Sequence, residues 1–130
     1  MVVAQTSRLR AAFPCSAEGA RRARKQVVEF AGLWLRDEDL VSFEMALGEA
    51  LANCVEHGGG PSLAVTCWRD DGSLVAEIHH EGRGFEPPAT VTPPPQGALR
   101  GYGLFIMHAV IDRIEFLEGG RGLRLSKRIR

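Results

Sequence analysis

The segment EALANCVEHG, residues 49–58, spaces three polar side chains four residues apart among small and apolar ones: Glu49, Asn53 and His57. In a helix this spacing stacks a carboxylate, an amide and an imidazole along one face, opposite an apolar arc. By itself the stripe is more simply the solvated face of an amphipathic helix. Combined with the glycines that follow later in the chain, a stacked carboxylate and amide are parts of a phosphate-binding site.

Two pairs of glycines supply the other parts of such a site. Gly82 and Gly84 follow a predicted strand, and Gly101 and Gly103 stand directly before the apolar run LFIM. Glycine lets the backbone approach a phosphate closely, and the free N–H groups and dipole at a helix start favour an anion. A single Gly-x-Gly more often marks a plain turn before a helix, so the inference depends on the combination.

The elements that position these residues begin with one strand and two helices. Loose alternation predicts a strand over 7–13, which Pro14 ends. Ser16 is the expected N-cap of a helix over 16–34, whose apolar residues recur at helical spacing. A second helix, over 39–57, carries the polar stripe and ends at the Gly-Gly-Gly-Pro sequence that follows it.

The second half of the chain predicts strands on either side of one long loop. Segments 62–68 and 73–80 form a hairpin through an Asp-Asp-Gly turn. Segment 81–103 is rich in proline and glycine, which predicts a functional or disordered loop. An apolar helix begins at Leu104 and gives way to a strand near Ile114, and the alternation in RGLRLSKRIR predicts a closing strand.

The order of these elements predicts an α+β fold, in which helices cover one face of a mostly antiparallel sheet. A chain of 130 residues fits one domain, taken as 1–130. Sixteen Lys and Arg balance sixteen Asp and Glu. The net charge therefore gives no reason to expect nucleic acid or an anionic membrane as a partner.

Cysteine usage and hydropathy predict the compartment. Cys15, Cys54 and Cys67 are odd in number, widely spaced and without a Cys-x-x-Cys pair, which argues against a disulfide framework or a zinc site. No stretch approaches the roughly 18 apolar residues of a membrane span, and the N-terminal residues do not read as a signal peptide. A soluble protein of the reducing cytoplasm is expected.

Four segments carry a resemblance to a known family. ALGEALANCVEHG, HEGRGFEPP and RGYGLFIMHAVIDRIEF look like an N box, a first glycine box and a second glycine box, and RLSKRIR looks like a closing strand. In this order and spacing they resemble the GHKL ATPase superfamily, and within it the stand-alone anti-sigma-factor serine/threonine kinases. The resemblance covers nearly the whole chain. It implies a two-layer α/β sandwich of the Bergerat type, with an ATP pocket beside the second helix and a lid over 87–100.

The resemblance also implies the roles of the site residues. Asn53 would hold Mg²⁺ through its amide oxygen, a hard ligand for a hard ion, and Glu49 would act as catalytic base toward a serine hydroxyl. The cofactors implied are ATP and Mg²⁺. The nucleotide site would comprise Asn53, His57, His80, Gly82, Gly84, Arg100, Gly101, Gly103 and Leu104.

Two of these residues have a second interpretation. His57 would face the phosphates or cap the helix C-terminus, and the cap is the simpler interpretation because Gly58 follows directly. Arg100 would neutralise a phosphate when the lid closes, or it is a solvated arginine of the loop.

Two positions depart from the family pattern. The first glycine box of the family usually begins with an Asp that accepts a hydrogen bond from the adenine amino group, and His80 stands at that place. A neutral imidazole nitrogen can accept one such bond but lacks the charge of a carboxylate. Glu81 could take this role if the chain shifted by one residue, but strand alternation points its side chain to the side opposite His80. A Thr that helps to hold adenine in relatives corresponds to Arg121, unless the alignment slips by one residue in the Gly-Gly turn.

Two hypotheses follow from these residues. The first is a protein serine/threonine kinase that phosphorylates a small antagonist protein and sequesters a sigma factor or similar partner, which explains Glu49 and Asn53. The second is a non-catalytic partner-switching module of the same fold that has lost ATP dependence, which explains His80 and Arg121. A homodimer is a further expectation, since such dimers are common among the relatives.

Overall fold

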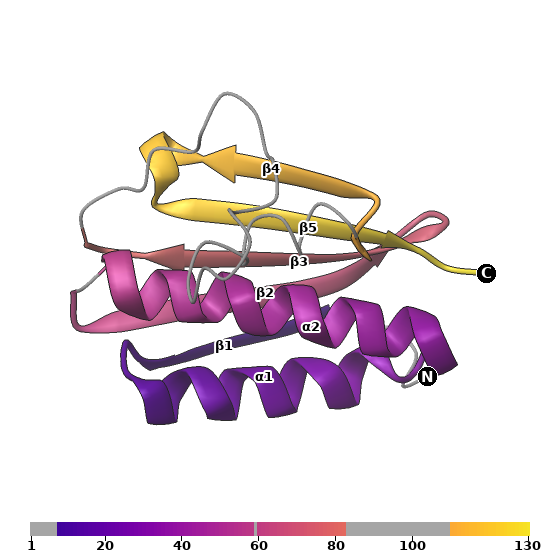
Figure 1. Cartoon of the computed structure of the whole chain (residues 1–130), viewed down its shortest axis with the longest axis horizontal. Helices are drawn as coiled ribbons and strands as arrows, with labels where there is room; N and C mark the ends of the chain where they lie inside the picture. The colour runs from indigo at the N-terminus through magenta and orange to yellow at the C-terminus, as the bar shows by residue number, and fades with distance from the viewer. Residues whose placement is uncertain (1–7, 59, 83–109) are drawn as a thin grey trace, which may run out of the picture.

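The computed structural model describes residues 8–58, 60–82 and 110–130 of the chain. In this part a five-stranded antiparallel sheet is covered on one face by two helices, so the protein is a two-layer α+β sandwich (Figure 1). This architecture confirms the fold class predicted from the sequence.

The sheet has the strand order β1-β2-β3-β5-β4, and every neighbouring pair is antiparallel. The closing strand β5 therefore lies inside the sheet, between the hairpin of β2 and β3 and the edge strand β4. The strands are β1 (Arg8–Pro14), β2 (Ser62–Asp70), β3 (Ser73–His80), β4 (Arg113–Leu117) and β5 (Gly122–Arg128).

The first helix, α1 (Ala17–Ala31), begins at the residue after its predicted N-cap. The Ser16 hydroxyl accepts a hydrogen bond of 3.1 Å from the Gly19 N–H, which satisfies one of the free donors of the first turn. A Cβ atom on Gly19 would lie 1.8 Å from the Pro14 carbonyl oxygen, so glycine is required where α1 crosses the end of β1. The helix ends three residues before the predicted 34.

The second helix, α2 (Asp37–Asn53), differs from its prediction at both ends. It begins two residues before the predicted Asp39, and three acidic residues in its first turn oppose the positive end of the helix dipole. At Cys54 the α-helix changes into a wider π-helical turn, η2 (Cys54–Gly58). The polar stripe of Glu49, Asn53 and His57 is therefore not continued at α-helical spacing beyond Asn53.

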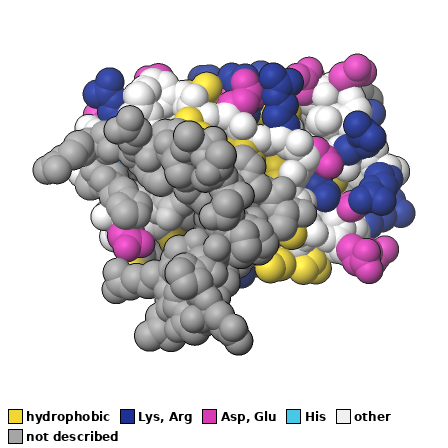
Figure 2. All heavy atoms as spheres, turned by 45° about the horizontal axis from the view of Figure 1, so that its top comes forward, with side chains coloured by type: hydrophobic (Ala, Val, Ile, Leu, Met, Phe, Trp, Pro, Cys, Tyr) yellow, Lys and Arg dark blue, Asp and Glu magenta, His cyan; other side chains and the backbone are white. Residues whose placement is uncertain are grey.

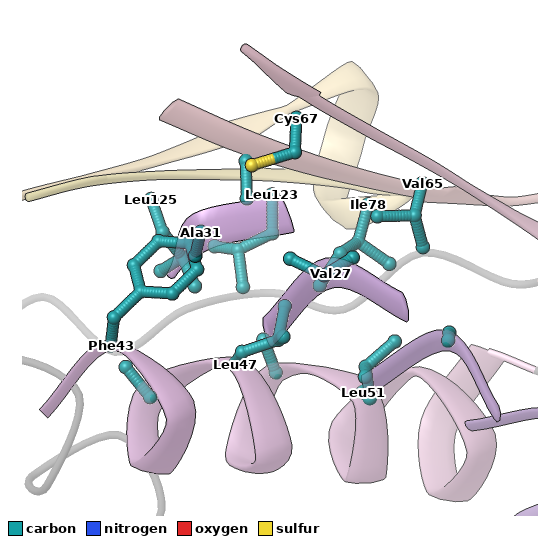
Figure 3. Packing of buried hydrophobic residues seen from close by; sticks show 14 of the residues in the cluster. Val27, Ala31, Phe43, Leu47, Leu51, Val65, Cys67, Ile78, Leu123 and Leu125 are labelled. Carbon is teal, nitrogen blue, oxygen red and sulfur yellow. The ribbon is translucent and has the colours of Figure 1, made fainter. Parts of the chain in front are cut away.

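The core lies between the helices and the inward face of the sheet. Strand register places every second residue of each strand on this face, as Leu63, Val65 and Cys67 of β2 illustrate. Figure 3 shows helix side chains meeting strand side chains from the opposite layer. The helix layer contributes Val27, Ala31, Phe43, Leu47 and Leu51 to this core, and the sheet contributes Val65, Cys67, Ile78, Leu123 and Leu125.

One cation is buried at the far end of this core. Lys127 points inward from β5 and is only 7% exposed. Its ammonium donates a 3.0 Å hydrogen bond to the Val110 carbonyl and lies 3.9 Å from Asp39 Oδ1. Asp39 also contacts Arg130 at 3.2 Å. Lys127 thereby joins the approach to β4 with the first turn of α2.

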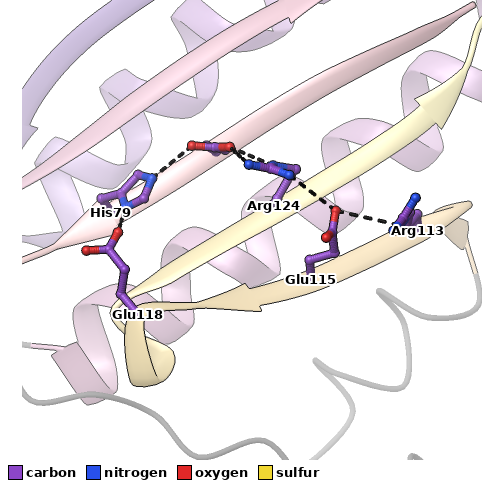
Figure 4. Close-up of polar contacts among 6 residues, drawn as sticks. His79, Arg113, Glu115, Glu118 and Arg124 are labelled. Atoms are coloured by element: carbon purple, nitrogen blue, oxygen red, sulfur yellow. Dashed lines mark hydrogen bonds and ion pairs between the residues drawn. The ribbon is translucent and has the colours of Figure 1, made fainter. Parts of the chain in front are cut away.

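The outward face of the sheet carries a ladder of alternating charges across three strands (Figure 4). Glu77 of β3 and Glu115 of β4 both face Arg124 of β5 in the strand register, with contacts of 2.6 Å and 3.5 Å. His79 extends the ladder, since Nε2 lies 3.0 Å from Glu77 and Nδ1 lies 2.7 Å from Glu118. Burial raises the pKa of Glu77, but hydrogen bonds from His79 and Arg124 outweigh burial and hold that pKa below its usual value.

Basic and acidic side chains are interspersed on the described surface that is visible in Figure 2, so neither sign of charge dominates there. Within residues 8–58, 60–82 and 110–130, no helix has the length and apolar character needed to cross a membrane.

Candidate functional site

A recess opens where the C-terminal end of α2 meets the sheet. Its volume is about 360 Å³, including the part open to solvent. Helix α2 and η2 form one side, β3 forms the floor, and β4, β5 and the 3₁₀ turn η3 (Glu118–Gly120) form the other side. The lining residues are Ala50, Asn53, Cys54, Ile78, His80, Phe116, Gly120, Gly122 and Leu123.

The lining is mostly apolar, with polar side chains from only two of these residues, Asn53 and His80. Cys54 counts among the apolar groups, because burial, with a smaller effect of the nearby Cys15, raises the pKa of its thiol to about 12. Apolar walls with a few placed polar groups are typical of sites for small organic ligands. The recess therefore suits a flat apolar ring that carries polar substituents.

Asn53 and Glu49 lie one turn apart on α2, as their spacing predicted. Both are half-buried, and neither side chain forms a hydrogen bond or ion pair with another described residue. Asn53, the last residue of α2, lines the recess, whereas Glu49 does not belong to the described lining. An amide and a carboxylate are thus available side by side, with the amide at the recess itself.

His80, the last residue of β3, is held in a defined orientation. Its backbone N–H donates to the Arg121 carbonyl at 3.0 Å, and its ring Nδ1 accepts a 3.3 Å hydrogen bond from the Gly82 N–H. Nδ1 is therefore already used within the protein. This changes the expectation that His80 accepts a hydrogen bond from an adenine amino group, because the remaining nitrogen of a neutral ring carries the proton.

Gly82 is the second predicted glycine-box residue that the structure places near the recess. It is half-buried beside His80, and it contacts the loop after η2, where a Cβ on Gly60 would come within 3.1 Å of the Gly82 nitrogen. Gly60 itself has a φ of 83°, which favours glycine. Close backbone packing therefore joins the end of η2 to the end of β3.

Several predicted site residues lie, in whole or in their side chains, outside the described residues. His57 belongs to η2, but its side chain is outside the described part of the structure. The remaining members of the predicted nucleotide site, and the predicted lid over 87–100, also lie outside the described residues: Gly84, Arg100, Gly101, Gly103 and Leu104.

The closing strand corrects one expectation. Arg121 does not line the recess; it is exposed, and its Nε donates to the Glu118 carbonyl at 3.4 Å. The residues that reach the recess from this strand are Gly122 and Leu123, one and two positions later. The turn through η3 has Gly119 and Gly120 at positive φ, and the shift of one residue is the slip that the sequence left open for this turn.

Glu81 does not replace His80 in the recess. Its side chain is exposed and accepts a 3.1 Å hydrogen bond from the Ser62 hydroxyl. This placement agrees with the prediction from strand alternation. Sequence reasoning did miss the apolar lining of Ala50, Ile78 and Phe116, although the inward parity of β3 and β4 would have pointed to the last two.

The comparison with protein-family models matches residues 13–129 to the histidine kinase-like ATPase domain. The chain belongs to the histidine kinase-like ATPase domain family. The α+β fold of the chain is consistent with that family, and the match supports membership of the wider GHKL-type superfamily. No individual curated protein matches the chain at a significant level.

Membership of this family implies ATP binding, usually with Mg²⁺, and the described residues of the ATPase domain fit a nucleotide and Mg²⁺. The apolar lining beside Asn53 and His80 suits a nucleotide base. Within the described residues no three His, Cys, Asp or Glu side chains come together as a metal site. A magnesium ion would accordingly be held by the amide oxygen of Asn53 and by phosphate oxygens, which are the hard ligands it prefers.

Proposed function

We propose that the protein is an anti-sigma-type serine/threonine kinase that uses Mg-ATP to phosphorylate a small antagonist protein, and that it sequesters a sigma factor or similar partner. One observation supports this proposal most strongly. Asn53 of α2 and His80 of β3, which are 27 positions apart, line the same recess. A nucleotide site assembled from the N box and the first glycine box requires that proximity.

Two further observations support a catalytic use of the recess. The amide of Asn53 and the carboxylate of Glu49 lie one helical turn apart and form no hydrogen bond or ion pair with another described residue, which suits groups that bind a ligand. The change from α2 to the π-helical η2 directly after Asn53 is a feature often found at functional sites.

Each residue has a defined task in this proposal. Bound Mg-ATP supplies the phosphoryl group. Asn53 holds the metal and so orients the phosphates, while Glu49 takes the proton that the attacking serine hydroxyl of the antagonist loses. The apolar lining keeps water away from the purine ring of the nucleotide, and His80 contacts the edge of that ring.

Isothermal titration calorimetry with ATP, with and without Mg²⁺, tests the metal role of Asn53. Mg²⁺ should strengthen ATP binding by the natural protein about tenfold, and Asn53→Ala should remove that difference. Gln26→Ala is a matched control, since it removes an exposed amide from α1, away from the recess. Equal Mg²⁺ dependence in Asn53→Ala and in the control would contradict the assignment.

Replacing the proposed base separates binding from catalysis. Glu49→Gln keeps the shape of the side chain and should leave ATP binding nearly unchanged, while phosphate transfer to the antagonist falls by a factor of about 10² or more. Transfer at the natural rate in this variant would exclude Glu49 as the base.

A second candidate function is a partner-binding module without catalysis. The observation that favours it is the contact between His80 Nδ1 and the Gly82 N–H, which occupies one ring nitrogen at the place where the family resemblance implies a carboxylate for adenine. This candidate predicts no nucleotide binding up to millimolar ATP in a folded protein that still binds its partner. For either function a homodimer is proposed as the assembled form, and sedimentation equilibrium tests it.

A further inference from the structure

The protonation of the His80 ring follows from its contact with Gly82. A backbone N–H can only donate, so the 3.3 Å contact between the Gly82 nitrogen and His80 Nδ1 requires an unprotonated Nδ1. A neutral imidazole has a single ring proton, which then resides on Nε2. His80 consequently has a hydrogen-bond donor at Nε2, while Nδ1 is occupied by the hydrogen bond from Gly82.

This donor has no partner among the described residues. Nε2 of His80 forms no hydrogen bond or ion pair within residues 8–58, 60–82 and 110–130. Apart from the Asn53 amide and the Cys54 thiol, the other side chains that line the recess, including Ile78 and Leu123, are hydrocarbon. A donor in such surroundings favours a ligand that carries an acceptor at the same place.

Two hydrogen bonds fix the orientation of the His80 ring, one through its backbone N–H and one through Nδ1. The His80 N–H is bonded to the Arg121 carbonyl, which fixes the end of β3 against β5. Turning the ring over would break the bond with Gly82. The neighbouring carboxylate cannot supply an acceptor instead, because Glu81 is exposed and bonded to Ser62. The recess therefore presents a donor at the position where the family resemblance implies a carboxylate that faces the adenine amino group.

We propose that the recess selects a purine nucleotide with an oxo group at ring position 6, as in hypoxanthine and guanine, over one with an amino group there, as in adenine. The inference rests on the proposed function, in which the recess holds the base of the nucleotide. A 6-oxo group accepts a hydrogen bond from His80 Nε2–H. The 6-amino group of adenine brings a second donor to the same place, so neither donor is satisfied.

Calorimetric titration with ITP and ATP, both with Mg²⁺, tests this selection. The two nucleotides share ribose and triphosphate and differ only around position 6 of the base, including the proton on the adjacent ring nitrogen. ITP should bind the natural protein about tenfold more tightly than ATP, the ratio expected when one hydrogen bond is made or lost. GTP, which carries the same 6-oxo group as ITP, should also bind more tightly than ATP.

Two variants of His80 give the reverse and the neutral result. His80→Asp replaces the donor with an acceptor and should turn the preference to ATP by about tenfold. His80→Gln offers both a donor and an acceptor and should bring the two affinities within about threefold. His79→Gln is the matched control, because it replaces the adjacent histidine, whose side chain lies in the ladder on the outward face of the sheet. Its ITP to ATP ratio should equal that of the natural protein.

The outcomes separate this inference from the function on which it rests. Tighter binding of ATP than of ITP by the natural protein would overturn the selection and leave nucleotide binding in place. The same ITP to ATP affinity ratio in the natural protein and in His80→Asp would show that His80 does not contact the nucleotide base. This result also overturns the proposed selection. Absence of binding for ITP, GTP and ATP alike, in a protein with a native melting transition, would refute the proposed function itself.

Discussion

Replacing Gly19 with alanine should destabilise the domain strongly, because the new Cβ would overlap the backbone of β1. The Cβ would lie 1.8 Å from the Pro14 carbonyl oxygen, whereas real contacts of this kind stay beyond 3.0 Å. The start of α1 and the end of β1 must therefore separate by at least about 1.2 Å, the difference between these two distances.

The size of the effect follows from two contributions. Overpacking in a close-packed interior costs about 1–3 kcal/mol, and displacing the Gly19 N–H from the Ser16 hydroxyl costs about 1 kcal/mol more. The free energy of unfolding should fall by roughly 2–4 kcal/mol, which lowers Tm by about 8–16 °C in a domain of this size. Urea and thermal unfolding followed by circular dichroism measure both quantities.

Gly32→Ala provides a matched control at the other end of the same helix. Gly32 has a φ of −62°, and a Cβ there would make only ordinary contacts, the nearest at 3.5 Å. Alanine should be neutral or stabilise by about 0.4–1 kcal/mol through the unfolded state. A Gly19→Ala variant as stable as Gly32→Ala would refute the argument that close packing of α1 on β1 requires glycine at position 19.

Three further predictions concern the charged and buried groups. Because the pKa of Glu77 is lowered in the folded protein, its contribution to stability is present above its ordinary value of about 4.5 and is lost as pH falls through the lower folded value. Glu77→Gln should therefore flatten the acid side of a plot of unfolding free energy against pH; an unchanged acid limb would contradict this. Lys127→Met keeps the buried volume but removes the bond to the Val110 carbonyl and the contact with Asp39, so urea unfolding should record a loss of about 1–3 kcal/mol. Burial raises the pKa of the Cys54 and Cys67 thiols to about 12, so iodoacetamide at neutral pH should alkylate both only on unfolding, and rapid labelling of the native protein would exclude such burial.

Much of the fold could be predicted from local signals in the sequence. The cap residue Ser16 and the apolar spacing located α1, and the Asp-Asp-Gly turn located the hairpin of β2 and β3, because both signals act over a few residues. The change from α2 to η2 at Cys54 was not predicted. Nothing in the helical period distinguishes a π turn, which depends on how the end of the helix packs against β3.

The candidate site was predictable in part for the same reason. Asn53 and His80 could be named because motif spacing identifies them, and the structure brings them to one recess. Whether Arg121 or the next residue reaches the recess was left open by the sequence, because the positive-φ glycines of η3 precede β5 and side-chain patterns do not reveal backbone conformation; the structure places Gly122 there. The bond from Gly82 to His80 likewise depends on a backbone N–H, a group that every residue type except proline carries.

Because Gly122 has no side chain, only its backbone separates the recess from His79 on the outward face of the sheet, and this closeness allows a spectroscopic experiment. On one side the Gly122 backbone lines the recess; on the other, a Cβ would come within 2.9 Å of His79 Nδ1, so the imidazole lies almost directly on the strand. Contacts of the His79 ring nitrogens with Glu77 and Glu118 hold the imidazole in this position. The nuclear magnetic resonance signals of His79 should therefore change when a ligand fills the recess, although the ring itself is on the opposite face. The protein thus contains its own reporter of occupancy, which requires no attached dye and leaves the recess untouched.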